Sequence, residues 1–174
     1  NVSKYNIIKE LYDKMMSLYT NRWRECINKT ENISGRGRNK LRNYCKSKTE
    51  YKAEHYCKII LAPKHRSALS RFRCGVAPIR IETGRYEHLV ENERLCQLCN
   101  LNAVESEVHV LMHYTQYAVL RQPLLDRAYT VNPNFNSLNE TDKLSFVLTD
   151  PNMCRISAKT CCDILNSRIF YLCK

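Results

Sequence analysis

Apolar residues recur at steps of three and four along most of the chain, and this period is typical of amphipathic helices. In the first half the pattern predicts three helices, over residues 4–27, 39–61 and 64–74. Pro63 ends the second of these runs, because proline has no backbone N–H to donate to the helical hydrogen-bond pattern. Gly75 follows the third, at a position where helix ends favour glycine.

The pattern changes after Gly75 and then returns. Within residues 76–95, the alternating apolar residues Ile79 and Ile81 lie between Pro78 and Gly84. This pattern predicts an extended connector or a small hairpin. The helical step returns over residues 105–121, with Pro123 expected to restart the helix. Two more helices are predicted, one from Leu138 to Leu148 and one after Asp150-Pro151.

The fold class expected from these elements is mainly α, with one small zinc-ribbon-like or knuckle insertion. A chain of 174 residues is long enough for one sizeable core. We expect three regions packed as one domain: a basic helical region (1–75), a connector with a Cys/His motif (76–122) and C-terminal helices (123–174).

Four residues between positions 96 and 113 have the side chains and spacing of a zinc site. Cys96 and Cys99 form a Cys-x-x-Cys turn, and His109 and His113 stand one helical turn apart, on one face of a helix. Four protein ligands leave no position for a substrate, so the predicted zinc is structural. The cysteine pair alone also fits a redox dithiol, although no βαβ pattern surrounds it. The other alternative is a core of structural thiols and buried histidines.

Positive charge is concentrated in the first half of the chain. Residues 1–80 contain 19 Lys and Arg against 6 Asp and Glu, whereas residues 81–174 contain 9 against 11. A one-sided basic surface predicts nucleic acid as the partner, bound through phosphates, with interleaved aromatic residues available to stack on bases. The alternative is a solvated helix face. The candidate contact residues are Arg36, Arg38, Lys40, Arg42, Lys46, Lys48, Lys52, Lys64, Arg66, Arg71 and Arg73.

Other classes of protein are disfavoured. No apolar run approaches the length of a membrane span, and phosphate loops, nucleophile elbows and zinc-protease motifs are missing from the sequence. We therefore expect a chain that is not itself an enzyme and has no membrane partner, although a Cys–His dyad formed in space stays open. Ten cysteines are too few for a disulfide scaffold of this length, which favours reduced thiols and an intracellular, nuclear or cytoplasmic location. Four Asn-x-Ser/Thr triplets leave a secreted alternative.

Several segments resemble the C-terminal tail of reverse transcriptases from invertebrate non-LTR, LINE-like retrotransposons. The resemblance covers about residues 39–125 and rests on Lys64 to Arg85, Arg94 to Cys99, Val104 to His109 and Tyr117 to Arg121. It implies a region without polymerase chemistry that follows a polymerase domain of the same polyprotein. It also implies that basic residues bind template RNA or target DNA beside a small zinc-binding motif.

The resemblance exposes one departure at the zinc motif. The family pattern places a cysteine five residues after the histidine, where this chain has Tyr114. A phenol is a poor zinc ligand at neutral pH, so either His113 supplies the fourth ligand or the site has become an apolar core. In the second case Tyr114 and His113 should pack or hydrogen-bond near the two thiols. The predicted function is a non-catalytic nucleic-acid-binding region braced by zinc, and the alternative is a helical protein-interaction or assembly module.

Overall fold

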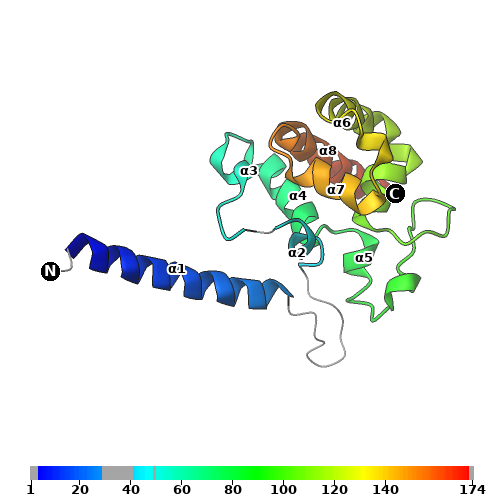
Figure 1. The fold of residues 1–174 in the computed structure, drawn as a ribbon. Coiled ribbons are helices and arrows are strands. Elements are labelled where there is room, and N and C mark those ends of the chain that lie inside the picture. Colours follow the sequence, from blue (N-terminus) through cyan, green and yellow to red (C-terminus); the bar gives the residue numbers. More distant parts are fainter. Residues whose placement is uncertain (1–3, 29–40, 49, 173–174) are drawn as a thin grey trace.

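The computed structural model describes residues 4–28, 41–48 and 50–172, and this part of the chain is mainly α (Figure 1). The α-helices are α1 (Lys4–Asn28), α2 (Tyr44–Ser47), α3 (His55–Lys58), α4 (Pro63–Cys74), α5 (Arg80–Thr83), α6 (Ala118–Val131), α7 (Glu140–Thr149) and α8 (Cys154–Leu172). Short turns of other types are η2 (Glu91–Glu93), η3 (His109–His113), η4 (Thr115–Tyr117) and η5 (Phe135–Ser137). None of the described helices is long and apolar enough to cross a membrane.

Helix α8 lies at the centre of the folded part, with α4, α6 and α7 packed against it (Figure 1). Its inward face consists of small and apolar residues, including Ala158, Cys161 and Ile164, all fully buried. Phe72 of α4 and Leu124 of α6 close the core from two sides. Burial of these side chains is the main stabilising contribution, because each removes apolar surface from water.

The predicted helix end at Gly75 is confirmed, and the helix predicted from Leu138 to Leu148 is found as α7 (Glu140–Thr149). Gly75 adopts a left-handed conformation, with φ of 73°, and its N–H donates to carbonyls in the last turn of α4. Asn139 is the N-cap of α7, and its side chain accepts a hydrogen bond of 2.9 Å from the N–H of Asp142. Helix α6 begins at Ala118, so that Pro123 lies inside this helix and does not start it.

The prediction of one long helix over residues 39–61 is wrong. Among its described residues only α2 and α3 form, each one turn long, and the chain turns at Lys48, whose side chain is buried. Its ammonium group lies 2.9 Å from the carboxylate of Glu54 and donates to the Lys52 carbonyl. A buried charge is costly unless it is paired, and Glu54 supplies that partner where the chain leaves the helical path.

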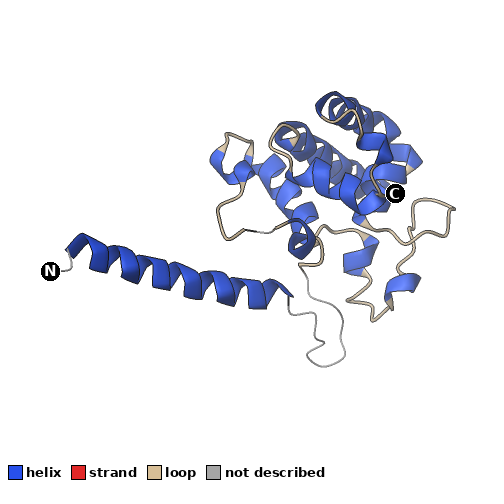
Figure 2. Ribbon diagram, viewed as in Figure 1, coloured by secondary structure: helices blue, strands red, loops and turns tan. Residues whose placement is uncertain are grey.

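The connector over residues 76–95 contains two helical turns, α5 and η2, and the predicted hairpin is not formed. Figure 2 draws no strand, and the strand-like pairing within the described residues is a single antiparallel bridge between Leu95 and Val104. This bridge brings the two ends of the Cys-x-x-Cys segment together.

Helix α1 extends away from the rest of the molecule (Figure 1). Its C-terminal end contacts the folded part, where Ile27 is buried and the Trp23 ring lies 5.8 Å from the ring of Tyr51. Most of its apolar face is exposed, unlike the apolar faces of α4 and α8.

Candidate metal centre

A short loop presents the two cysteines. The bridge between Leu95 and Val104 is extended by a hydrogen bond of 2.9 Å from the Cys96 N–H to the Ala103 carbonyl. Asn102 takes a positive φ of 49°, which closes the loop, and asparagine tolerates this left-handed conformation better than most residues. The Cys-x-x-Cys turn is therefore held at both ends by backbone pairing.

Cys96, Cys99 and His109 converge on one point. Their ligand atoms all lie within 4.8 Å of one another, and the Cys99 Sγ lies 3.5 Å from the His109 Nε2. Zinc with ordinary Zn–S and Zn–N bond lengths in a tetrahedron separates a sulfur from a nitrogen by about 3.5 Å. Cys96 and His109 are buried and Cys99 is half-buried. The three side chains therefore have the types and spacing to hold a metal ion.

Burial also changes the pKa values of Cys96 and His109. It raises the pKa of the Cys96 thiol to about 11, and it lowers the pKa of His109 below its usual value. A neutral imidazole is the form that binds a metal, so burial of His109 favours binding, whereas Cys96 must lose a proton when it binds one.

Tyr114, and not His113, lies over the cysteine turn. The Tyr114 hydroxyl donates a hydrogen bond of 2.6 Å to the Leu98 carbonyl, inside the Cys-x-x-Cys turn, and its ring lies 5.8 Å from the His109 ring. η3 is a π-helical turn, closed by a bond of 2.8 Å from the Tyr114 N–H to the His109 carbonyl. One additional residue in the turn brings position 114 back over position 109.

His113 lies outside this group and is half exposed. Its Nε2 lies 2.8 Å from a carboxylate oxygen of Glu140, at the beginning of α7. The group that the structure brings together among the described residues thus has three of the four ligands predicted from the sequence. The hydrogen bond of Tyr114 is the contact expected if the site were an apolar core, whereas the contact expected of His113 in that case is not formed.

A buried ion pair attaches this loop to α8. Glu105 follows the bridge residue Val104, and its carboxylate accepts hydrogen bonds from the Arg168 guanidinium of α8 and, at 2.6 Å, from the Arg80 N–H. Arg168 also donates to the Pro78 carbonyl at 3.0 Å. Glu105 and Arg168 are almost fully buried, and their separation in sequence gave no indication of this contact.

Three of the predicted nucleic-acid contacts are internal ion pairs. The Arg42 guanidinium pairs with Glu107 and Glu82, and Lys48 pairs with Glu54. Arg73 is buried, lies 2.6 Å from Glu54 and covers the Tyr56 ring at 5.3 Å. We assign these three cations to the fold, because their charges already have buried partners.

The remaining predicted contacts divide into two groups. Lys46, Lys52, Lys64 and Arg71 are exposed, and the half-buried Arg66 donates to the Ile59 carbonyl at 3.0 Å. Arg36, Arg38 and Lys40 lie outside the described residues. Of the aromatic residues considered for base stacking, Phe72 is buried in the core.

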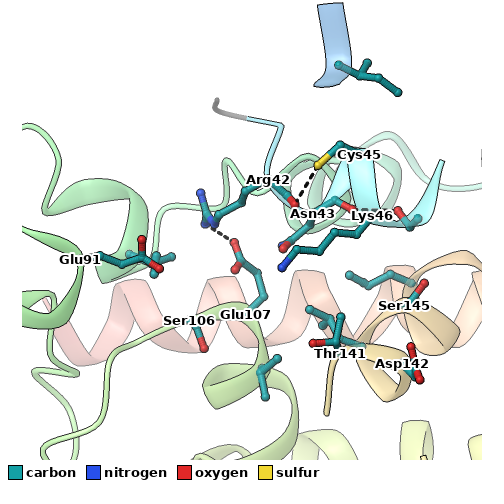
Figure 3. Close-up of a pocket in the computed structure, with 16 residues that line it drawn as sticks. Arg42, Asn43, Cys45, Lys46, Glu91, Ser106, Glu107, Thr141, Asp142 and Ser145 are labelled. Carbon is teal, nitrogen blue, oxygen red and sulfur yellow. Dashed lines mark hydrogen bonds and ion pairs between the residues drawn. The ribbon is translucent and has the colours of Figure 1, made fainter. Parts of the chain in front are cut away.

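A cavity of about 550 Å³ lies beside α2 and α7 (Figure 3). Arg42 points across it toward Glu107, and Lys46 lies on the same side (Figure 3). Glu91 and Asp142 also line it. Because three carboxylates and two cations line it, the cavity does not favour a polyanion.

Comparisons with known proteins found no matching family model, and no curated protein or solved structure proved similar to the chain.

Proposed function

We propose that this chain is a non-catalytic nucleic-acid-binding region in which a zinc ion at Cys96, Cys99 and His109 braces the connector. Two thiolates and an imidazole form a donor set that zinc prefers among the common divalent ions. Three protein ligands leave one tetrahedral position for a water or another small ligand. The nearby Glu105 carboxylate is held by Arg168 and by the Arg80 N–H, which supports a structural role.

The observation that carries the binding proposal is an exposed basic stripe on α4. Lys64, Ser67 and Arg71 are exposed at steps of three and four residues, so they lie along one face of the helix. The opposite face, with Leu69 and Phe72, is in the core and fixes the stripe at the surface. Two cations about 10 Å apart on a rigid helix can each neutralise a phosphate of a bound strand.

Two further considerations support a nucleic acid as the partner. Positive charge is still in excess over residues 41–80 after the buried pairs of Arg42, Lys48 and Arg73 are set aside, because Lys46, Lys58, Lys64 and Arg71 are exposed. The resemblance to retrotransposon reverse transcriptase tails points to RNA or target DNA, and to a polymerase domain of the same polyprotein as a second partner.

Binding is tested by fluorescence anisotropy with labelled single-stranded RNA and DNA at several salt concentrations. We expect the logarithm of the affinity to fall linearly with the logarithm of salt concentration, since phosphate neutralisation releases counterions. The double variant K64E/R71E should weaken binding about tenfold or more at low salt.

The matched control is R127E/K159E, which makes the same charge change at exposed positions of α6 and α8. Circular dichroism of both variants establishes that the helices are intact. Equal loss of affinity in the two variants would show that only net charge matters. No binding to either nucleic acid at low salt would contradict the proposal.

A further inference from the structure

Helix α1 carries an exposed apolar face that the nucleic-acid proposal does not use. Ile8, Leu11, Met15 and Leu18 are 57%, 58%, 53% and 70% exposed, although such residues are normally buried in a soluble helix. The helix has 25 residues, and only its last two turns reach the folded part, through Trp23 and Ile27. An apolar face of this length marks an interaction surface.

The residues of this face repeat at intervals of seven. Ile8 and Met15 are seven apart, as are Leu11 and Leu18, and the two series alternate at steps of three and four. This is the a and d pattern of a coiled coil, with Ile8 and Met15 at a and the leucines at d. Isoleucine at a with leucine at d favours two parallel strands.

We propose that α1 forms a parallel, two-stranded coiled coil with the α1 helix of a second copy of this chain. This self-association goes beyond the proposed nucleic-acid binding and does not depend on it. In a parallel pair each residue of the seam meets the same residue of the other copy, so Leu11 packs on Leu11 and Leu18 on Leu18.

The residues that flank the seam agree with parallel pairing. In a parallel coiled coil the g position of one helix meets the e position of the next heptad on the other helix. Ile7 would then contact Tyr12, and the Lys14 stem and ammonium group would cover the Tyr19 ring. All four residues are exposed in the single chain. An antiparallel pair would bring the two g positions together and place Lys14 opposite Ile7 or another Lys14.

The seam ends where the helix meets the folded part. Arg22 and Glu25 occupy the next a and d positions, and neither is favourable against its own copy. At this point Trp23 and Ile27 turn the other side of α1 toward its own chain. Two heptads make a short seam, so the dimer should dissociate on dilution.

Sedimentation velocity of the full chain, under reducing conditions and free of nucleic acid, measures this association. We expect a monomer and dimer in an equilibrium that depends on concentration. L11E and L11K should each be monomeric, since a charge at d would face its own copy. The control N6E, on the exposed polar face, should associate like the unmodified chain.

Mixing the two variants tests the pairing itself. If Leu11 meets Leu11, then L11E and L11K restore the dimer when combined, because opposite charges face one another. A mixture that stays monomeric would overturn parallel pairing in register. An unmodified chain that stays monomeric at its solubility limit, or an L11E variant that still dimerises, would overturn self-association through this face.

Discussion

At the scale of single residues, Tyr114 is the side chain that packs on the cysteine loop and His109. Its hydroxyl satisfies the Leu98 carbonyl, and its ring fills the space beside His109. The buried tyrosine therefore packs beside His109 and the cysteine turn, and His113 pairs with Glu140 outside the group. The spacing of the histidines suggested a different arrangement, because an i to i+4 pair shares one face in a regular helix.

Replacing Tyr114 with cysteine should strengthen metal binding. The π-helical turn holds position 114 over His109, so a thiol there would complete a tetrahedral set of protein ligands. We expect zinc affinity, measured by competition with a chromophoric chelator, to rise roughly tenfold or more in Y114C. Y114S leaves a similar cavity without a zinc ligand and is the control. An equal affinity in Y114C and Y114S would show that position 114 does not reach the metal.

At the scale of elements, the attachment of the connector to α8 is the contact on which the loop depends. The carboxylate of Glu105 and the guanidinium of Arg168 are buried together, between the bridge at Val104 and the last turns of α8. Removing one partner of a buried ion pair is costly, because the other charge is left without compensation.

R168M should therefore destabilise the fold by about 3–5 kcal/mol. Urea unfolding followed by circular dichroism measures this loss. The double variant E105Q/R168M removes both charges and should recover part of the stability, since no unpaired charge remains. A double variant less stable than R168M would show that each side chain contributes through other contacts.

The sequence predicted those elements whose limits are set locally. Pro63 and Gly75 mark the limits of α4, because proline and glycine act on the backbone next to them. The helix over residues 39–61 could not be judged in this way. At the interruption Lys48 pairs with Glu54, and Glu54 pairs with Arg73 of α4, a contact between segments that local sequence does not reveal.

The candidate site could be predicted in part. The Cys-x-x-Cys turn and His109 could be recognised from spacing, and the structure brings these three residues together. The position of His113 could not be derived, because the π-helical turn depends on the burial of Tyr114 and on its bond to Leu98. The exposure of the apolar face of α1 could not be predicted either, since an amphipathic pattern does not reveal what covers that face.

At the scale of the whole molecule, ion pairs connect the acidic second half of the chain to the basic first half. The acidic half supplies Glu82 and Glu107, which pair with Arg42 of the basic half. Such pairs hold the segment before α2 against the connector, whereas Lys64 and Arg71 of α4 face solvent. A metal ion at Cys96 would brace the same connector from its other end.

Zinc held by Cys96, Cys99 and His109 is tested by elemental analysis of the full chain, purified without added metal. We expect about one zinc per chain, loss of the zinc in C96S, and full retention in H113A, because His113 lies with Glu140. A chain without zinc, or an H113A variant that loses it, would overturn this assignment.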